Sequence, residues 1–305
     1  MLDLTTLTTE SRNKETMNLD EMSPLEIARV MNQEDEQAVL AVRKVLPQIA
    51  TAISWATESL KAGGRIIYLG AGTSGRLGVL DAAECPPTFG VSPDMVVGMI
   101  AGGEGAFIKA REGVEDSKTL GAEDLKSKNL TEKDIVIGLA ASGRTPYVIY
   151  GLQYAKSIGC RTVAIVCNLH SPLSRTADLA IEPVPGPEVL TGSTRLKAGT
   201  VQKQILNMIS TGSMVGIGKV YQNLMVDVQQ TNEKLKVRAQ NIVMDVTDCS
   251  RERAAEALEA SDGKVKTAIV MILKGCTSQE AGEQLEKAGG HIRQAIRTEA
   301  FAEIS

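Results

Sequence analysis

The chain has 305 residues, of which 43% are hydrophobic but only 3% aromatic, and a net charge of -4 at pH 7. This length predicts about two domains, and the negative charge gives no electrostatic basis for binding nucleic acid or an anionic membrane. The five cysteines form no CxxC pair, which is typical of reduced thiols in the cytosol. The N-terminus lacks an apolar signal core, and no apolar run approaches the ~20 residues of a membrane-spanning helix. The expected location is the cytoplasm.

The N-terminal part combines a polar arm with helices. Residues 1–22 are polar and rich in threonine, which predicts an extended arm. A first helix is expected to begin at Ser23-Pro24, because proline is favoured in the first turn. A second helix is expected from residue 34 to residue 61, with an interruption near Pro47. The acidic residues 34–36 and the lack of a basic recognition helix argue against a DNA-binding head.

From residue 65 onward, apolar runs alternate with helical patterns. The alternation predicts an α/β domain with a parallel sheet and helices on both faces, in which ligands bind at the carboxyl ends of the strands. The expected strands are residues 66–69, 95–100, 135–140, 163–167 and 179–184. Further helices are expected at 195–220 and 226–241. A small bundle of three short helices is expected to follow between residues 251 and 296, with breaks at 261–263, 275 and 289–290.

The stretch from residue 65 to 87, RIIYLGAGTSGRLGVLDAAECPP, predicts a strand, a glycine-rich turn and a helix that stops at Pro86-Pro87. Glycines let the backbone approach an anion closely, and the free N–H groups of a helix N-terminus bind phosphate. Thr73 and Ser74 add two hydroxyl donors, which suit a terminal phosphate. The turn also fits GxGxxG, but a dinucleotide site needs an acid after the second strand, where this chain has apolar residues and glycine. A monophosphate is therefore favoured over NAD.

A second loop, LAASGRTP at residues 139–146, resembles LGAGTSGR at residues 69–76. Both loops place small residues, hydroxyls and an arginine directly after a strand, so the two can build one site from two sides. The alternative is that Ser-Gly-Arg is common turn chemistry. Ser142 lacks a nucleophile elbow and a histidine partner, and is interpreted as a phosphate ligand. His170 and His291 show no metal-ligand spacing, so no metal is expected.

Two glutamates are the candidates for acid–base chemistry, with a buried salt bridge or a helix cap as the alternative role of each. Glu84 lies at the end of the predicted helix, on the same face as Leu77 and Leu80. A helix C-terminus and apolar surroundings both raise the pKa of a carboxyl group, which favours a proton donor near neutral pH.

The second glutamate, Glu115, lies in EGAFIKAREGVEDS at residues 104–117, which is interpreted as a helix. Phe107, Ala110 and Val114 are expected to form the inner face of this helix. Glu115 lies about 80° from Phe107, at the edge of that face, whereas its acidic neighbours fall on the outer side. Glu115 is therefore expected to point into a cleft.

Several motifs extend over nearly the whole chain: TESRN at 9–13, GAGTSGR at 70–76, DAAECPPTFG at 81–90, IAGGEGAF at 100–107, ASGRTPYV at 141–148 and GSTRLKAGT at 192–200. Together they closely resemble the N-acetylmuramic acid 6-phosphate etherase family. The resemblance implies a three-layer αβα sugar isomerase (SIS) domain, a homodimer and no cofactor. The expected division is an N-terminal arm and helices at 1–55, the SIS domain at 56–220 and a C-terminal helical region at 221–305.

The family uses water to cleave the ether between a D-lactyl group and C3 of a phosphorylated amino sugar, in the recycling of bacterial cell-wall fragments. By resemblance, Glu84 is the proton donor and Glu115 the second acid/base residue. The residues expected to hold the phosphate are Thr73, Ser74, Ser142 and Thr145. Thr194 and Lys197 of the last motif are expected to lie near the substrate.

Two other functions stay open on the sequence. A sugar-phosphate isomerase would share this domain and would release a rearranged sugar rather than D-lactate. A non-catalytic regulator resembling the glucokinase regulatory protein would bind a kinase without turnover. Members of that family join two SIS modules, and only one is evident here.

Overall fold

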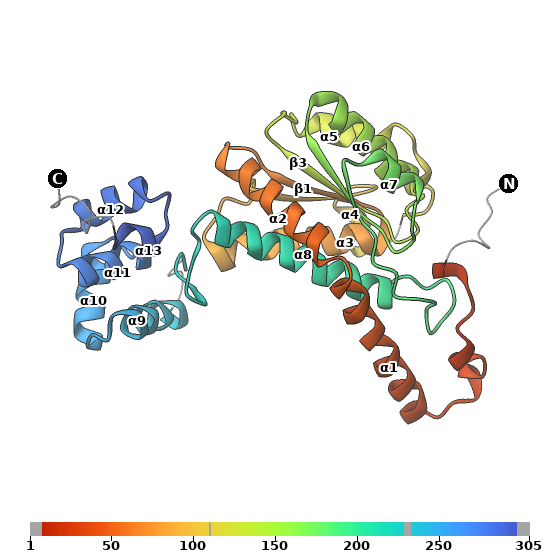
Figure 1. Ribbon diagram of the computed structural model, residues 1–305, viewed down its shortest axis with the longest axis horizontal. Helices are drawn as coiled ribbons and strands as arrows, with labels where there is room; N and C mark the ends of the chain where they lie inside the picture. Colours follow the sequence, from red (N-terminus) through yellow and green to blue (C-terminus); the bar gives the residue numbers. More distant parts are fainter. Residues whose placement is uncertain (1–7, 110, 229–232, 298–305) are drawn as a thin grey trace. The chain divides into compact units, whose positions relative to one another are not determined.

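The computed structural model describes residues 8–109, 111–228 and 233–297 (Figure 1). The chain forms two compact units, one of Met1–Ala83 with Pro93–Thr211 and one of Glu84–Ser92 with Gly212–Ser305. The three-part division expected from the sequence stays a prediction. Within the described ranges, no helix has the length and apolar character that crossing a bilayer requires.

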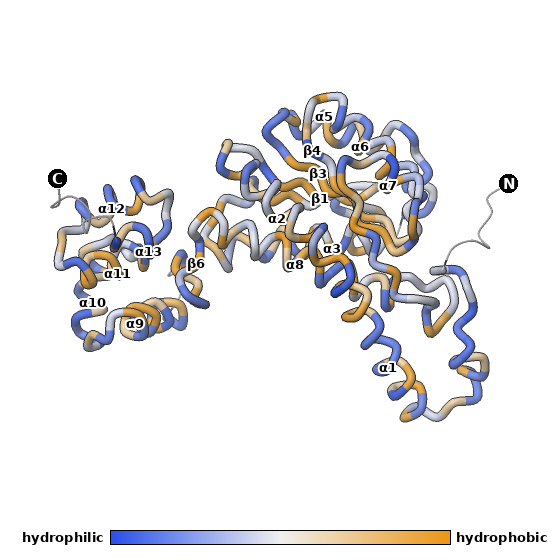
Figure 2. Tube along the Cα trace, in the orientation of Figure 1, coloured by the Kyte–Doolittle hydropathy of each residue, from blue (hydrophilic) through white to orange (hydrophobic). Residues whose placement is uncertain are grey.

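The first unit is built on a five-stranded parallel sheet with the strand order β2-β1-β3-β4-β5. Every residue of β1 and β3 is buried, which explains why these strands are continuous apolar runs in the sequence and not alternating patterns. All five predicted strands are confirmed, and Figure 2 shows β1, β3 and β4 as apolar segments. The strands are β1 (Ile66–Gly70), β2 (Val96–Ile100), β3 (Ile135–Leu139), β4 (Arg161–Ile165) and β5 (Leu179–Ile181).

Helices cover both faces of this sheet (Figure 1), with α5, α6 and α7 on one face and α2, α3 and α8 on the other. On α6, the side chains of Tyr147, Val148 and Leu152 are fully buried in a core shared with the strands. The arrangement confirms the predicted three-layer αβα fold. The helices are α2 (Leu46–Lys61), α3 (Gly72–Phe89), α5 (Leu120–Ser127), α6 (Pro146–Ile158), α7 (Pro172–Thr176) and α8 (Lys197–Gly216).

The strand order reverses between β1 and β3. β1 pairs with β2 on one side and with β3 on the other, and Gly70 lies opposite Leu139 in the register of β1 and β3. The loops that leave these two strands therefore start side by side at the carboxyl edge of the sheet. Such a reversal is where open α/β sheets form their ligand crevice.

Helix α3 does not stop at Pro86 and Pro87, as the sequence predicted, but continues through them to Phe89. Each proline removes one N–H donor from the helix. Here that loss falls in the last turns, and the carbonyl of Pro86 still accepts a hydrogen bond from Gly90 N at 2.9 Å. The helix consequently ends five residues after Glu84, so the predicted position of Glu84 at the helix C-terminus is wrong.

The N-terminal helices differ from their prediction in one boundary. Helix α1 (Pro24–Arg43) begins at Pro24 as expected, with Ser23 and Glu26 forming a capping box. It has no break near residue 34, so the boundary predicted there is wrong. The chain breaks instead before α2, close to the interruption predicted near Pro47. In front of α1, residues 8–21 form three 3₁₀ turns of the arm, and Thr16 Oγ1 donates a hydrogen bond to the carbonyl of Val189 at 2.9 Å.

The second unit contains a hairpin and a helical bundle. The hairpin of β6 (Val220–Tyr221) and β7 (Leu224–Met225) was not predicted. The helix expected at 226–241 is described from Glu233 onward, and residues 229–232 lie outside the described residues. The three predicted breaks are confirmed, but they separate four helices and not three. The four helices are α10 (Arg251–Ala260), α11 (Val265–Lys274), α12 (Ser278–Lys287) and α13 (Ile292–Ala295), and α9 (Glu233–Thr247) precedes them.

An ion pair joins the starts of β1 and β3. Arg65 donates to Asp134 from its backbone N–H and from its guanidinium, both at 2.8 Å, and Thr131 N donates to the same carboxylate at 2.9 Å. Burial acts to raise the pKa of Asp134, but the hydrogen bonds from Arg65 and Thr131 outweigh it and lower the pKa below the ordinary value of 3.8. The stability that this pair contributes is therefore present at neutral pH and is lost as the pH falls through the lowered pKa.

The substitution Asp134→Ala is expected to lower the free energy of unfolding by about 2–4 kcal/mol at neutral pH, because it leaves buried donors without an acceptor. Urea unfolding measures this change, and the difference from wild type should shrink in acid. Glu58→Ala is the matched control, since Glu58 pairs with Arg161 at 2.5 Å but both side chains are exposed. Its expected cost is about 0–1 kcal/mol. Equal costs for the two variants would contradict the prediction.

Candidate functional site

The loop after β1 leads directly into the first turn of α3. A Cβ on Gly70 would lie 2.6 Å from Gly75 N, so glycine allows the end of the strand to touch the start of the helix. Ser74 is buried in this turn, and its hydroxyl donates to Gln202 Oε1 of α8 at 2.9 Å. Thr73 is half-buried beside it. The free N–H groups of the α3 N-terminus lie on the same turn.

The loop after β3 places its hydroxyls at the neighbouring strand end. Ser142 Oγ accepts a hydrogen bond from Arg144 N at 3.2 Å, which holds the loop in a local turn. Thr145 is the N-cap residue of α6, and its side chain makes no capping hydrogen bond. The predicted juxtaposition of the two loops is confirmed by the pairing of β1 with β3. The role of their hydroxyls in binding phosphate stays a prediction.

The third motif forms the start of α8. A Cβ on Gly199 would lie 3.7 Å from Thr73 Cγ2 and 3.8 Å from the carbonyl oxygen of Thr194, so this motif contacts the first turn of α3. The carboxylate of Glu188 caps the start of α8, because it accepts from Lys197 N at 2.9 Å and from Ala198 N at 3.0 Å.

Lys197 is buried, and its ammonium forms an ion pair with Glu34 of α1. Burial raises the pKa of Glu188, which caps the same helix start. In this chain Lys197 therefore connects α8 to α1, and the expectation that it lies near the substrate stays a prediction. Neither contact was predicted from the sequence. Glu34 is distant along the chain from Lys197, and Glu188 lies in a loop without a recognisable motif.

The face of α3 that packs inward is not the predicted one. Leu80 is 45% exposed, and Glu84 is also exposed. The buried face carries small residues instead, and a Cβ on Gly78 would lie 2.9 Å from Tyr68 Cβ of β1. Because α3 lies so close to the sheet, only small residues fit on the face that contacts it. Glu84 lies on the accessible side of the helix.

Glu115 does not lie on a continuous helix. Helix α4 (Gly105–Ile108) is a single turn, and Glu115 belongs to a separate 3₁₀ turn, Val114–Asp116, that follows Gly113. Gly113 has a φ of +78°, a left-handed conformation that interrupts a helix. The helical-wheel position predicted for Glu115 is therefore wrong, and Ala110 of the predicted inner face lies outside the described residues. The side chain of Glu115 is exposed.

Arg76 connects α3 to the segment that carries Glu115. Its Nε donates to the carbonyl of Phe107 at 2.8 Å, and its second guanidinium nitrogen donates to the carbonyl of Ala106 at 2.9 Å. Arg76 thus caps the C-terminal end of α4, and these contacts assign it a structural role.

Asp81 is a buried carboxylate that sequence reasoning missed, although it lies only three residues before Glu84. It accepts hydrogen bonds from Tyr68 Oη at 2.9 Å, Asn207 Nδ2 at 2.7 Å and Ser210 Oγ at 3.1 Å. Burial raises the pKa of Asp81, and these hydrogen bonds act in the opposite direction. The three bonds join α3 to β1 and α8. The signal in the sequence was an acidic residue among small and apolar residues, between Leu80 and Ala82.

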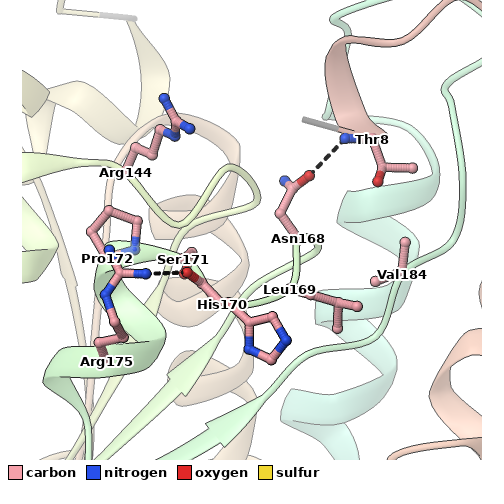
Figure 3. Close-up of a pocket in the computed structure, with 9 residues that line it drawn as sticks. All are labelled: Thr8, Arg144, Asn168, Leu169, His170, Ser171, Pro172, Arg175 and Val184. Carbon is pink, nitrogen blue, oxygen red and sulfur yellow. Dashed lines mark hydrogen bonds between the residues drawn. The ribbon is translucent and has the colours of Figure 1, made fainter. Parts of the chain in front are cut away.

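A pocket of about 420 Å³ borders the loop after β3 (Figure 3). Arg144, His170 and Arg175 give it a basic lining. Figure 3 shows the Arg175 guanidinium hydrogen-bonded to the carbonyl of His170, and Thr8 N hydrogen-bonded to Asn168 Oδ1. None of the eight predicted site residues lines this pocket. Across the described part of the chain, no group of three or more His, Cys, Asp or Glu side chains is arranged to hold a metal ion.

Comparison with known families assigns the sheet region. Residues 48–156 match the glucokinase regulatory protein N-terminal SIS domain, and residues 119–211 match the SIS domain. The chain is 62% identical over 88% of its length to the N-acetylmuramic acid 6-phosphate etherase of Pectobacterium atrosepticum, of which it covers 89%. It belongs to the N-acetylmuramic acid 6-phosphate etherase family. The etherase of Clostridium beijerinckii is 59% identical over 88% of both chains.

Family membership confirms the resemblance that the sequence motifs indicated. Among solved structures, a phosphoheptose isomerase from Francisella tularensis superposes with a TM-score of 0.49 at 16% identity, covering 62% of this chain and 100% of that one. The two SIS matches together span residues 48–211, which include the whole parallel sheet of the first unit. Glu84 and the hydroxyls of the two loops lie within the etherase motifs quoted from the sequence, whereas Glu115 lies between two of them.

Proposed function

We propose that the protein is an N-acetylmuramic acid 6-phosphate etherase, a carbon–oxygen lyase that releases D-lactate and N-acetylglucosamine 6-phosphate. The observation that carries the proposal is its 62% identity, over 88% of the chain, to a protein with that name. The pairing of β1 with β3 supports it, because two hydroxyl-bearing loops start side by side at one edge of the sheet.

The phosphate of the substrate is proposed to bind between these loops. Thr73 and Ser74 lie in the first turn of α3, and Thr145 is the N-cap residue of α6. Both helices direct free backbone N–H groups and the positive end of their dipoles toward their N-termini, which favours a phosphate dianion. Ser142 adds a fourth hydroxyl from the loop after β3. Thr194 is a proposed further contact, supported by the approach of its motif to the first turn of α3, where a Cβ on Gly199 would lie 3.7 Å from Thr73 Cγ2.

The chemistry needs two proton-transfer groups. Opening of the sugar ring makes C1 an aldehyde, and the proton on C2 becomes acidic. A base removes this proton while an acid protonates the departing lactyl oxygen, since an ether oxygen is otherwise a poor leaving group. Water then adds to the double bond at C3. The bond between C3 and the lactyl oxygen breaks in the elimination, and both the elimination and the addition of water are assisted by proton transfers that carboxyl groups catalyse.

Glu84 is proposed as the acid that protonates the lactyl oxygen, and Glu115 as the group that exchanges the C2 proton. The assignment follows the family resemblance, and the exposure of both side chains supports it, since each can be reached by a ligand. A cytoplasmic homodimer is the proposed form of the enzyme. The homodimer follows the resemblance to the etherase family.

Turnover of N-acetylmuramic acid 6-phosphate in H₂¹⁸O tests the reaction. The expected result is ¹⁸O at C3 of the sugar and none in D-lactate, because elimination breaks the bond between C3 and the ether oxygen before water adds. Mass spectrometry of both products gives the answer. Label in lactate would contradict elimination and readdition, and a rearranged sugar without lactate would favour an isomerase.

A further inference from the structure

A buried amide on α8 contacts the proposed phosphate loop. Gln202 is 1% exposed, and its Oε1 accepts the hydrogen bond from Ser74 Oγ at 2.9 Å. Its Nε2 is also fully buried and has no hydrogen-bond partner among the described residues. A buried N–H without an acceptor destabilises the folded state, so an apolar side chain of this size would suit the position better unless the amide serves the site.

The position of Gln202 is fixed by the packing of α8. The start of the helix is capped by Glu188 through Lys197 N and Ala198 N. Gly199, one turn before Gln202, is close enough to Thr73 that a Cβ would lie 3.7 Å from Thr73 Cγ2. The amide therefore reaches Ser74 from a rigid element and not from a loop.

The direction of the hydrogen bond between Ser74 and Gln202 decides whether the Ser74 hydroxyl can donate to a bound anion. A serine hydroxyl has one proton and two lone pairs. While that proton is donated to Gln202 Oε1, the hydroxyl presents only lone pairs to a phosphate, which repel its oxygens. A half-turn of the terminal amide reverses this arrangement. Nε2 then donates to Ser74 Oγ, and the hydroxyl proton becomes available to a phosphate oxygen.

We propose that Gln202 is a positioning residue for the phosphate site, whose amide reverses when a phosphorylated sugar binds and thereby makes Ser74 a donor to the phosphate. The proposal rests on the proposed function in that it takes the loop after β1 as the phosphate site. It adds a polarity to that site. The reversal gives Nε2 an acceptor but takes the Ser74 proton from Oε1, so it is favoured when a phosphate oxygen accepts that proton.

Binding of N-acetylglucosamine 6-phosphate to the full-length protein, measured by calorimetry at about pH 8 to keep a glutamate ionised, tests the proposal. Gln202→Glu offers only acceptors, so it retains the Ser74 proton and should raise the Kd at least about tenfold, since a hydrogen bond to a charged group contributes about 1.5–3 kcal/mol. Gln202→Met leaves the Ser74 hydroxyl free to rotate. The Kd of this variant should therefore be at least about threefold lower than the Kd of Gln202→Glu. The KM for substrate should rise in parallel, with kcat at saturation nearly constant.

The double variant Ser74→Ala with Gln202→Glu separates positioning from a general packing effect. Once Ser74 has lost its hydroxyl, Gln202→Glu should add little further loss of affinity, because contacting residues that act together are non-additive. Thermal unfolding of each variant without ligand checks that it folds. Equal losses for the methionine and glutamate variants, or additive losses in the double variant, would overturn the proposal. The assay needs no lactate release, so an inactive wild type that still binds this ligand would refute the proposed function alone.

Discussion

Replacing Glu84 with glutamine is expected to lower the rate of D-lactate release by about 10²–10⁴-fold, the usual contribution of a positioned general acid. Glutamine keeps the size and polarity of the side chain but has no transferable proton. Because Glu84 is exposed on α3, the change should leave the fold and the affinity for N-acetylglucosamine 6-phosphate nearly intact. Lactate release under single-turnover conditions measures the effect directly.

Exchange of the C2 proton with solvent deuterium separates the roles of the two glutamates. If Glu84 is the acid, Glu84→Gln keeps this exchange while lactate release stops, and Glu115→Gln loses both. Glu112→Gln is the matched control, since Glu112 is an exposed glutamate on the same segment as Glu115. Loss of exchange in Glu84→Gln, with exchange retained in Glu115→Gln, would reverse the two assignments.

The sheet could be predicted from the sequence because each of its strands is an apolar run bounded by polar or glycine-rich segments. In a parallel sheet covered by helices on both faces, nearly every strand residue is buried. An apolar run therefore identifies a strand without knowledge of its neighbours in the sheet. The same reasoning failed for α3. The wheel assigned its inner face to Leu77 and Leu80, whereas the sheet contacts the glycines on the other side, where Gly78 approaches Tyr68. Which stripe of a helix is buried depends on how closely its neighbour approaches, and small residues mark that approach.

The segment of Glu115 shows a second limit. A helix at 104–117 satisfied the apolar spacing, but Gly113 in the left-handed region and the hydrogen bonds from Arg76 to the end of α4 divide it. The contact of Arg76 with Phe107 joins residues 31 positions apart. Lys197 and Glu34 are separated by 163 positions, and Ser74 and Gln202 by 128. Pairs of this kind form only in the tertiary fold. The periodicity of residues along one helix or strand does not predict them.

Asp81 is expected to have the largest effect on stability of any single residue at this site. Replacing it with alanine removes the acceptor of Tyr68, Asn207 and Ser210 together, and should lower the free energy of unfolding by about 3–5 kcal/mol because buried donors are left unpaired. It should also reduce the rate of lactate release, since these bonds hold α3 and hence the start of the turn that carries Glu84. Asp81→Asn keeps one acceptor oxygen and should cost much less.

The pH dependence distinguishes the charge of Asp81 from its hydrogen bonds. Burial raises its pKa above the ordinary value of 3.8, so the folded state binds the proton more tightly than the unfolded state. The wild type therefore has the full contribution of Asp81 in acid below that value and loses part of it as the pH rises through the raised pKa. Asparagine does not titrate, so the penalty of Asp81→Asn should be largest in acid and smallest at neutral pH. Urea unfolding across this range gives the sign, and a penalty that instead grows toward neutral pH would mean that the ionised carboxylate stabilises the fold.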